Sequence, residues 1–250
     1  MRTKYFAVAI TAVLALLITG QPTAGSADSS AANVLPSASL TGMVKFLGTV
    51  PIPARIDMSA DPKCAQLHPA PVVGQDILKD AGDGLQNVIV FISEGLGART
   101  FDPPPQPAVI DQKGCMYGPR VIALRANQKL RVVNSDPTTH NIHPMPKNNR
   151  EWNKSQPPGL PIEETFAREE IAIPVKCNIH SWMRGYIAVF KHPYFAVTGK
   201  NGNFDVKNLP PGAYTIQAWH EKLGTLTQKI TVEANETKTV QFVFKAPPGL

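Results

Sequence analysis

Several residue types and motifs are scarce or absent in this chain of 250 residues. It has only three cysteines and 7% Phe, Trp and Tyr, and no helix-like hydrophobic periodicity follows the apolar N-terminus. An α-helical bundle is therefore not expected. Despite a formal net charge of +6, there is no Lys/Arg run and no basic patch with interleaved aromatics, which argues against nucleic acid binding. The C-x-x-C-H motif of covalent haem, a Gly-rich phosphate loop and a Ser-His-Asp spacing are also missing.

Proline is abundant by contrast, with 24 residues spread through the chain. This discourages long helices and suits short strands joined by turns. Residues 61–67 are the one place beyond the N-terminus where we predict a single helical turn, and we expect residues 144–162 to form a long polar loop. The fold class predicted is all-β. Five β-branched runs are the clearest predicted strands: 42–48, 85–93, 120–126, 129–135 and 185–191.

The N-terminus has the pattern of a secretory signal. Arg2 and Lys4 precede an apolar run over 5–18, and small residues follow it. The apolar run is too short to span a bilayer comfortably. We predict a cleaved signal peptide over 1–27, a flexible lead-in over 28–39, and a mature protein without a membrane span in the periplasm or outside the cell.

The odd number of cysteines is informative in an exported protein. Two of them can form a disulfide, and the third is left over. Cys64 and Cys115 lie in loop-like sequences, whereas Cys177 stands beside His180 and Met183. We predict a Cys64–Cys115 disulfide and a Cys177 thiolate held by a metal, because a free thiol outside the cell tends to oxidise.

The segment 177–183 reads C-N-I-H-S-W-M. It offers thiolate, imidazole and thioether ligands from Cys177, His180 and Met183. This soft, mixed set suits one copper ion that cycles between Cu(I) and Cu(II), whereas zinc rarely recruits methionine. Strand alternation over 171–177 predicts that Ile171, Ile173 and Val175 share the inward face with Cys177, and Pro174 on the other face indicates an edge strand or a bulge.

A second histidine ligand must come from elsewhere in the chain. The sequence N-S-D-P-T-T-H-N-I-H over 134–143 offers both His140 and His143, just past the predicted strand 129–135. His140-Asn141-Ile142 together with the loop of Cys177 resembles the cupredoxins, especially the short-loop amicyanins. The resemblance implies a Greek-key sandwich, a type 1 copper site with His140 as the ligand, and a hydrogen bond from the Asn141 N–H to the Cys177 sulfur. His143 is then a neighbouring residue or an extra ligand.

Trp182 and Arg184 are candidates for a docking surface. Trp182 has two readings that stay open, a core aromatic or part of an apolar patch where a redox protein docks. The positive charge of Arg184 favours an acidic partner. His68, His192 and His220 are expected to have packing or surface roles.

The C-terminal part resembles a carboxypeptidase regulatory-like domain, a small transthyretin-like β-sandwich. The matching run comprises Thr198, Gly202, Phe204, Val206, Leu209, Pro210, Pro211, Gly212 and Tyr214. The opening strands of such a domain are matched by 42–48 and 85–93, before the copper motifs. We therefore predict a cupredoxin over 105–191 that is inserted into a regulatory-like sandwich built from 40–98 and 193–246. Two tandem domains are the simpler alternative.

The expected function is one-electron transfer between redox proteins rather than catalysis. Copper delivery or storage, with His143 and Met145 as extra ligands, is one alternative. The other is an extracytoplasmic binding module whose copper site is degenerate.

Overall fold

The computed structural model describes Met1, Thr3 and residues 37–246, and its strands confirm the all-β class. The expected signal peptide therefore lies almost wholly outside the described residues, as does most of the lead-in. The first strand, β1 (Ala38–Leu47), begins before residue 40, so the predicted lead-in over 28–39 extends too far. In the part of the chain that the structure describes, no helix has the length and apolar composition that crossing a bilayer requires.

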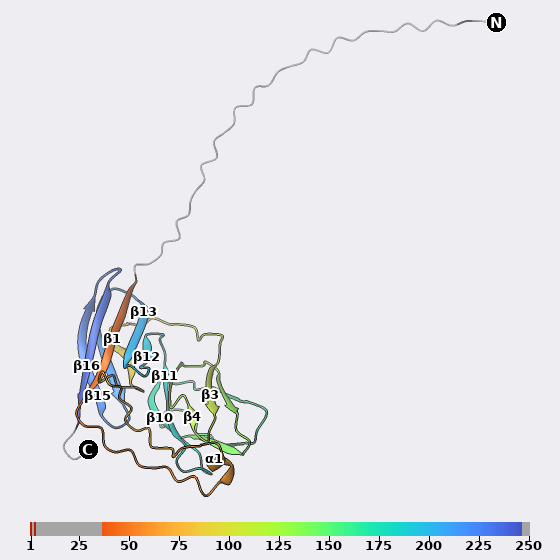
Figure 1. Ribbon diagram of the computed structural model, residues 1–250. Helices are drawn as coiled ribbons and strands as arrows, with labels where there is room; N and C mark the ends of the chain where they lie inside the picture. Colours follow the sequence, from red (N-terminus) through yellow and green to blue (C-terminus); the bar gives the residue numbers. More distant parts are fainter. Residues whose placement is uncertain (2, 4–36, 247–250) are drawn as a thin grey trace. The chain divides into compact units, whose positions relative to one another are not determined.

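The strands form four sheets, in which β1 lies between β13 and β16 (Figure 1). The first sheet contains β13 (Asn203–Leu209), β1 and β16 (Thr237–Lys245). The second contains β12 (Phe195–Val197), β2 (Ile89–Glu94), β14 (Gly212–His220) and β15 (Gly224–Val232). The third contains β5 (Val121–Arg125), β11 (Arg184–Phe190), β10 (Glu170–Lys176), β7 (His140–Pro144) and β8 (Lys154–Gln156). The fourth contains β4 (Tyr117–Gly118), β3 (Ala108–Gln112), β6 (Leu130–Asn134) and β9 (Ile162–Glu164). The single helical turn predicted near Asp61 is present as α1 (Pro62–Gln66).

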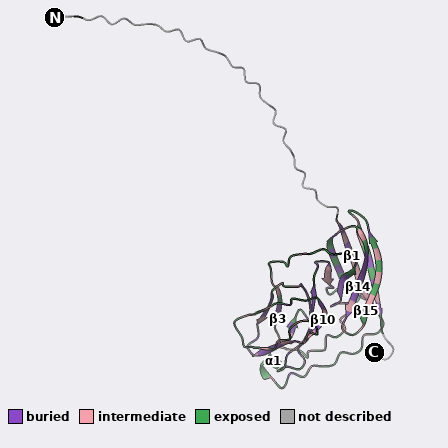
Figure 2. Ribbon diagram, turned by 180° about the vertical axis from the view of Figure 1, so that it is seen from behind, coloured by how far each residue is buried: buried purple, intermediate pink, exposed green. Residues whose placement is uncertain are grey.

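Strands that are apolar on both faces stack the sheets, and β2 and β11 are two examples. In β2, Val90 packs in the core that it shares with β1 and β16. Phe91, on the other face of β2, packs with Phe190 in a second core, called the middle core below. In β11, Phe190 lies in that same middle core, and Ile187 lies in the core shared with the fourth sheet. Alternation along a strand sends successive side chains to opposite faces, so each of these strands joins two cores. Strand β15 lies at the edge of its sheet, and its residues are mostly exposed or half-buried (Figure 2).

A bulge in β10 changes the predicted inward face. Ala172 has a φ of 61°, and the pairing of β10 with β11 is irregular between Glu170 and Ile173. As a result Ile171 packs in the middle core, while Ile173 packs in the core that holds Cys177. Pro174 itself pairs regularly with Tyr186, and the bulge of β10 lies two residues earlier; β10 is an inner strand and not an edge. The prediction of four inward residues by simple alternation was wrong at Ile171.

One further expectation needs correction. The predicted loop over 144–162 contains β8 and the start of β9. Residues 199–202 form a turn, with Gly202 at a φ of 72°. This turn joins β12 to β13, which belong to different sheets. His140 is the first residue of strand β7.

The early strands pair with the C-terminal strands across the intervening segment. Strand β1 pairs in parallel with β16 from Ser39↔Thr237 to Leu47↔Lys245, and β2 pairs antiparallel with β14. These pairings lie in two facing sheets of one sandwich, since both sheets contribute to one core. The domain boundaries at 40–98, 105–191 and 193–246 stay a prediction.

The buried His220 predicts a loss of stability in acid. Its side chain is 1% exposed, and burial lowers its pKa to about 4. An unfolded histidine titrates near 6.5, so between about pH 6.5 and pH 4 the unfolded state binds more protons. The free energy of unfolding should therefore decrease as the pH is lowered from about 6.5 to 4, by about 3 kcal/mol for this one group.

The variant His220→Asn tests this by urea unfolding across that pH range. Asparagine keeps an acceptor for the Lys222 N–H, which now bonds to the His220 Nδ1, but it does not titrate. Burial also lowers the pKa of His192 to about 4 and lowers that of His140, so the slope should fall in this variant but not vanish. A variant with the slope of the unaltered protein would contradict the assignment.

Candidate metal centre

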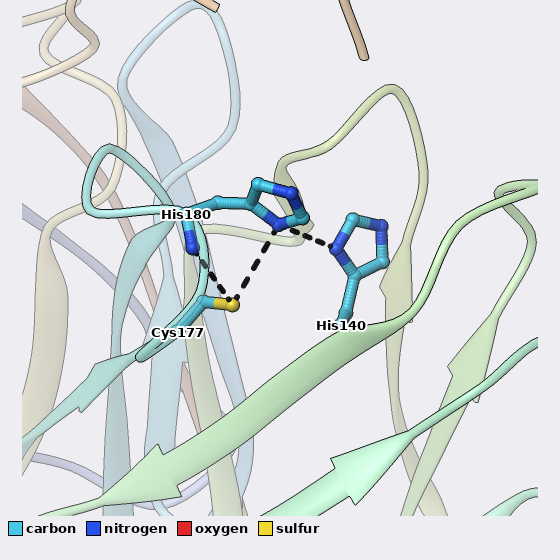
Figure 3. A group of neighbouring side chains, drawn as sticks. All are labelled: His140, Cys177 and His180. Atoms are coloured by element: carbon cyan, nitrogen blue, oxygen red, sulfur yellow. Dashed lines mark hydrogen bonds between the residues drawn. The ribbon is translucent and has the colours of Figure 1, made fainter. Parts of the chain in front are cut away.

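Three of the predicted ligands meet at one end of the third sheet. His140 starts β7, Cys177 follows β10, and His180 lies in the loop between β10 and β11 (Figure 3). The two Nδ1 atoms are 3.0 Å apart, and the Cys177 Sγ lies 3.8 Å from the Nδ1 of His180. One ligand atom from each residue lies within 4.8 Å of the other two. All three residues are buried.

Backbone hydrogen bonds fold the loop 177–183 tightly. The Cys177 N–H donates to the Met183 carbonyl (3.1 Å), and the Met183 N–H donates to the His180 carbonyl (3.0 Å). The His180 N–H donates to the Cys177 sulfur (3.3 Å). Met183 is fully buried in the same core as Cys177. The short spacing in sequence therefore becomes a closed loop that carries three of the expected ligands, Cys177, His180 and Met183, all of them buried.

A buried carboxylate holds His140 from its other side. The His140 Nε2 lies 2.8 Å from the Oδ2 of Asp136, which is 4% exposed. The Gly114 and Cys115 N–H groups each donate to this carboxylate at 2.7 Å. Burial lowers the pKa of His140 even though Asp136 opposes this shift, so the neutral imidazole is favoured. The Nε2–H then donates to Asp136, and the Nδ1 lone pair faces the cluster.

A second carboxylate holds His180 in the same way. The His180 Nε2 lies 3.0 Å from the Oδ2 of Asp61, the N-cap residue of α1. Thr138 also donates to this oxygen, and the Lys63 N–H donates to the other. Burial acts to raise the pKa of Asp61, but the hydrogen bonds from His180 and from the Lys63 backbone hold it below its usual value.

This arrangement fits a cation between the histidines. With both Nε2 atoms donating to carboxylates, the two Nδ1 atoms present lone pairs to each other at 3.0 Å. Two facing lone pairs repel unless a proton or a metal ion lies between them. The Cys177 sulfur beside them adds a third donor of the soft kind. The residues therefore suit a thiophilic metal ion, while the ligand assignment itself stays a prediction.

The predicted disulfide between Cys64 and Cys115 is present, with Cα atoms 5.6 Å apart. It fastens α1 to the segment between β3 and β4, directly beside the cluster. The Cys64 Sγ lies 3.6 Å from the His180 Nε2, and the Cys115 N–H donates to Asp136. Both sulfurs are buried, so the bridge covers the outer edges of the two histidines. Cys177 is the free cysteine of the described residues, as expected.

His143 lies apart from the cluster. In β7 it alternates with His140, so its side chain points to the opposite face. Its Nε2 lies 2.6 Å from the Oε1 of Glu151, and its Nδ1 lies 3.3 Å from the Oδ1 of Asn178. Both ring nitrogens therefore have partners outside the cluster.

Asn141 contacts the ligand loop through its side chain. Its Oδ1 accepts from the Asn178 N–H at 3.0 Å. Among the described residues, the backbone N–H that donates to the Cys177 sulfur is that of His180, and no such bond from Asn141 is found. Asn141 thus fastens β7 to the residue after Cys177.

Trp182 is neither a fully buried core aromatic nor a fully exposed surface residue. The indole is half-buried against the core, its ring centroid is 5.1 Å from that of His180, and its Nε1–H donates to the Cys115 carbonyl at 3.0 Å. It therefore braces the ligand loop against the disulfide. Arg184 is exposed and donates through Nε to the Ser181 carbonyl. Ile179 is 53% exposed at the tip of the loop.

Sequence reasoning missed Asp136 and Asp61. The sequence does contain a hint that Asp136 could contact His140, because it stands four residues before that histidine in a turn-rich segment of polar residues. It contains none for Asp61, because 119 residues separate Asp61 from His180. No rule of local spacing brings two such positions together.

Comparisons with known proteins return the two families whose motifs the sequence resembles. The sequence model of the carboxypeptidase regulatory-like domain matches residues 187–245. Amicyanin from Paracoccus versutus is 16% identical with a TM-score of 0.31, over 40% of this chain and 96% of that one. A purple cupredoxin from Nitrosopumilus maritimus is 21% identical with a TM-score of 0.29, over 33% of this chain and 98% of that one.

A copper-containing nitrite reductase from Thermus scotoductus also matches. It is 19% identical with a TM-score of 0.33, over 40% of this chain. The match spans only 25% of the length of that reductase. No curated protein matches the chain.

Replacing the carboxylate behind His140 should weaken metal binding. Asp136→Asn removes the charge that orients the imidazole, and such outer partners change metal affinity by about 10- to 100-fold. Competition with a chromophoric chelator for copper measures this. The matched control is Glu151→Gln, which removes the carboxylate on His143 and should leave the affinity unchanged. An equal loss of copper affinity in the two variants would contradict the assignment of His140, and not His143, as the ligand.

Proposed function

We propose that this protein is an exported type 1 copper protein that passes single electrons between redox proteins. One copper ion is held by His140, Cys177, His180 and Met183. The observation that carries the proposal is the meeting of three buried donor atoms within 4.8 Å of one another. Both histidines present the nitrogen that is not already bonded to a carboxylate.

The chemistry of the donors favours copper over other metals. Two imidazoles and one thiolate with a thioether form the soft, mixed set of blue-copper sites, whereas structural zinc sites use cysteine and histidine alone. Copper, when bound, supplies a one-electron couple between Cu(I) and Cu(II). The protein supplies the position of the ligands and the exclusion of water.

The residues around the ligands are suited to hold one geometry. Asp136 and Asp61 fix the orientation of the two imidazole rings through their Nε2 atoms. Asp136 is itself held by two backbone N–H groups, and Asp61 by Thr138 and α1. A site that keeps its geometry in both oxidation states needs little rearrangement when an electron arrives, which suits a carrier.

Electron transfer is favoured over catalysis because the ligands are enclosed. His140 and Met183 are fully buried, and His180 is covered by Asp61 and the disulfide. A substrate would have to displace these groups to reach a metal ion at the histidines. The enclosure also disfavours copper delivery, since His143, the expected extra ligand, is engaged by Glu151 on the other face of β7.

We further propose that the copper-bearing segment over 105–191 is inserted into the regulatory-like sandwich over 40–98 and 193–246. The pairing of β1 with β16 and of β2 with β14 supports this division. Export through a signal peptide over 1–27 to the periplasm or the outside is part of the proposal. The disulfide in the described residues is in keeping with an oxidising compartment.

The thiolate assignment is tested by Cys177→Ser. The copper-loaded protein should show an intense thiolate-to-copper band in visible light, and Cys177→Ser should lack it while its circular dichroism stays that of a β protein. The control is the double variant Cys64→Ser with Cys115→Ser, which removes the other two sulfurs. The control should keep the band but lose about 4 kcal/mol of stability, because the disulfide closes a long loop. An intense band in Cys177→Ser would overturn the proposal.

The choice between the two histidines of β7 is tested by a matched pair. His140→Gln should abolish the type 1 spectrum, because its Nδ1 faces the cluster, whereas His143→Gln should change it only slightly. Visible absorption and electron paramagnetic resonance of copper-loaded protein measure both. The reverse outcome would move the ligand to His143.

A further inference from the structure

A hollow of about 530 Å³ opens beside Cys177, on the same loop as the candidate ligands. Cys177 itself contributes to the lining, although it is only 2% exposed. The principal lining residues are Met145, Lys176, Cys177, Asn178, Ser181 and Arg184. No aspartate or glutamate lines it.

Two cations stand side by side at this hollow. Lys176 in β10 is directly opposite Arg184 in the antiparallel strand β11. Residues directly opposite in an antiparallel pair project from the same face, and like charges there destabilise the sheet. Neither residue forms an ion pair within the described residues. The repulsion between them would be relieved by an anionic group brought from outside.

Nearby acids do not neutralise this pair. An adjoining hollow shares Ser181 and Arg184 with the first and contains Asp76 and Glu221. Those two carboxylates are already bound by Arg120, at 2.8 Å and 2.6 Å respectively. On the other side of Lys176, its pairing partner His143 holds the carboxylate of Glu151. Lys176 and Arg184 themselves thus line the hollow without an ion pair among the described residues.

The other approach to the ligands is closed and acidic. The outer edge of the His180 ring is covered by Asp61 and by Cys64 of the disulfide, and His180 is 2% exposed. The His140 ring ends on the buried Asp136. A partner at the histidine side would meet a covalently fastened cover, whereas a partner at the hollow would meet Lys176 and Arg184, which line it together with Cys177.

We propose that this hollow is the docking site for an acidic redox protein, whose surface carboxylates pair with Lys176 and Arg184, and that the electron crosses at Cys177. The crossing rests on the proposed copper function, but the docking does not. One electron leaves the reduced centre of the partner and reduces Cu(II) to Cu(I), with no proton transferred and no bond formed or broken. Paired charges of this kind steer association and raise its rate.

The docking is tested on metal-free protein with a hexaglutamate peptide as the acidic probe. Backbone amide shifts in nuclear magnetic resonance should move around Lys176, Asn178 and Arg184. The double variant Lys176→Glu with Arg184→Glu should bind the peptide about tenfold or more weakly. The control, Lys229→Glu with Lys245→Glu, makes the same change in net charge at exposed positions of β15 and β16 and should bind as the unaltered protein does.

Three outcomes of this titration would overturn the docking. Equal weakening in both double variants would show attraction by net charge alone. Shifts confined to another face would place the docking elsewhere. Equal shifts with free glutamate at the same carboxylate concentration would show a small-anion site and not a protein-docking surface.

The crossing at Cys177 is tested on copper-loaded protein with two small reductants of opposite charge. Reduction by hexacyanoferrate(II) should slow about tenfold in the Lys176→Glu, Arg184→Glu variant, and reduction by hexaammineruthenium(II) should not slow. Equal rates of reduction by hexacyanoferrate(II) in the variant and the unaltered protein would overturn the crossing. If the protein binds no copper, the proposed function and the crossing both fail, while the peptide titration still decides the docking.

Discussion

The hydrogen bond between Asp61 and His180 is the constraint on which the arrangement of the site depends. Asp61 lies between β1 and β2, two strands of one sandwich, while His180 lies between β10 and β11 of the third sheet. The contact therefore requires the segment after β1 to reach over the ligand loop. Two further interactions hold it there, the N-cap of α1 and the Cys64–Cys115 disulfide. The orientation of the His180 ring is thus set by a part of the chain that carries no ligand.

The packing of the sheets on one another fixes where the segment after β1 lies relative to the ligand loop. Because β2 and β11 bury apolar side chains on both faces, each of them packs against two successive cores and fixes the sheets to one another. Arg120 adds a polar fastening between the same parts, with a bidentate contact to Glu221 after β14. Burial acts to lower the pKa of Arg120, but Glu221 and Asp76 outweigh it and raise the pKa. A buried pair of this kind adds little net stability, but it resists a change of register or orientation.

Charges are distributed unequally around the candidate ligands. Carboxylates stand behind both histidines, where they hold the rings and favour a cation between them. Cations stand beside the cysteine at the surface. The same short loop, 177–183, meets both environments, because its residues alternate between the interior and the solvent. The proposed binding of a metal ion and the proposed approach of an anionic partner would therefore use different sides of one loop.

The sequence alone determined the all-β class, the helical turn after Asp61, the free Cys177 and the loop that brings His180 and Met183 close to it, because these follow from local spacing and residue type. Tertiary structure decided what local patterns do not contain. The bulge at Ala172 moved Ile171 to another core, and the turn at Gly202 joined two sheets because the pairing of β13 with β1, distant in sequence, outweighed hairpin formation. Asp61 became a partner of His180 only through long-range packing, since a contact across 119 residues leaves no periodic trace in the sequence.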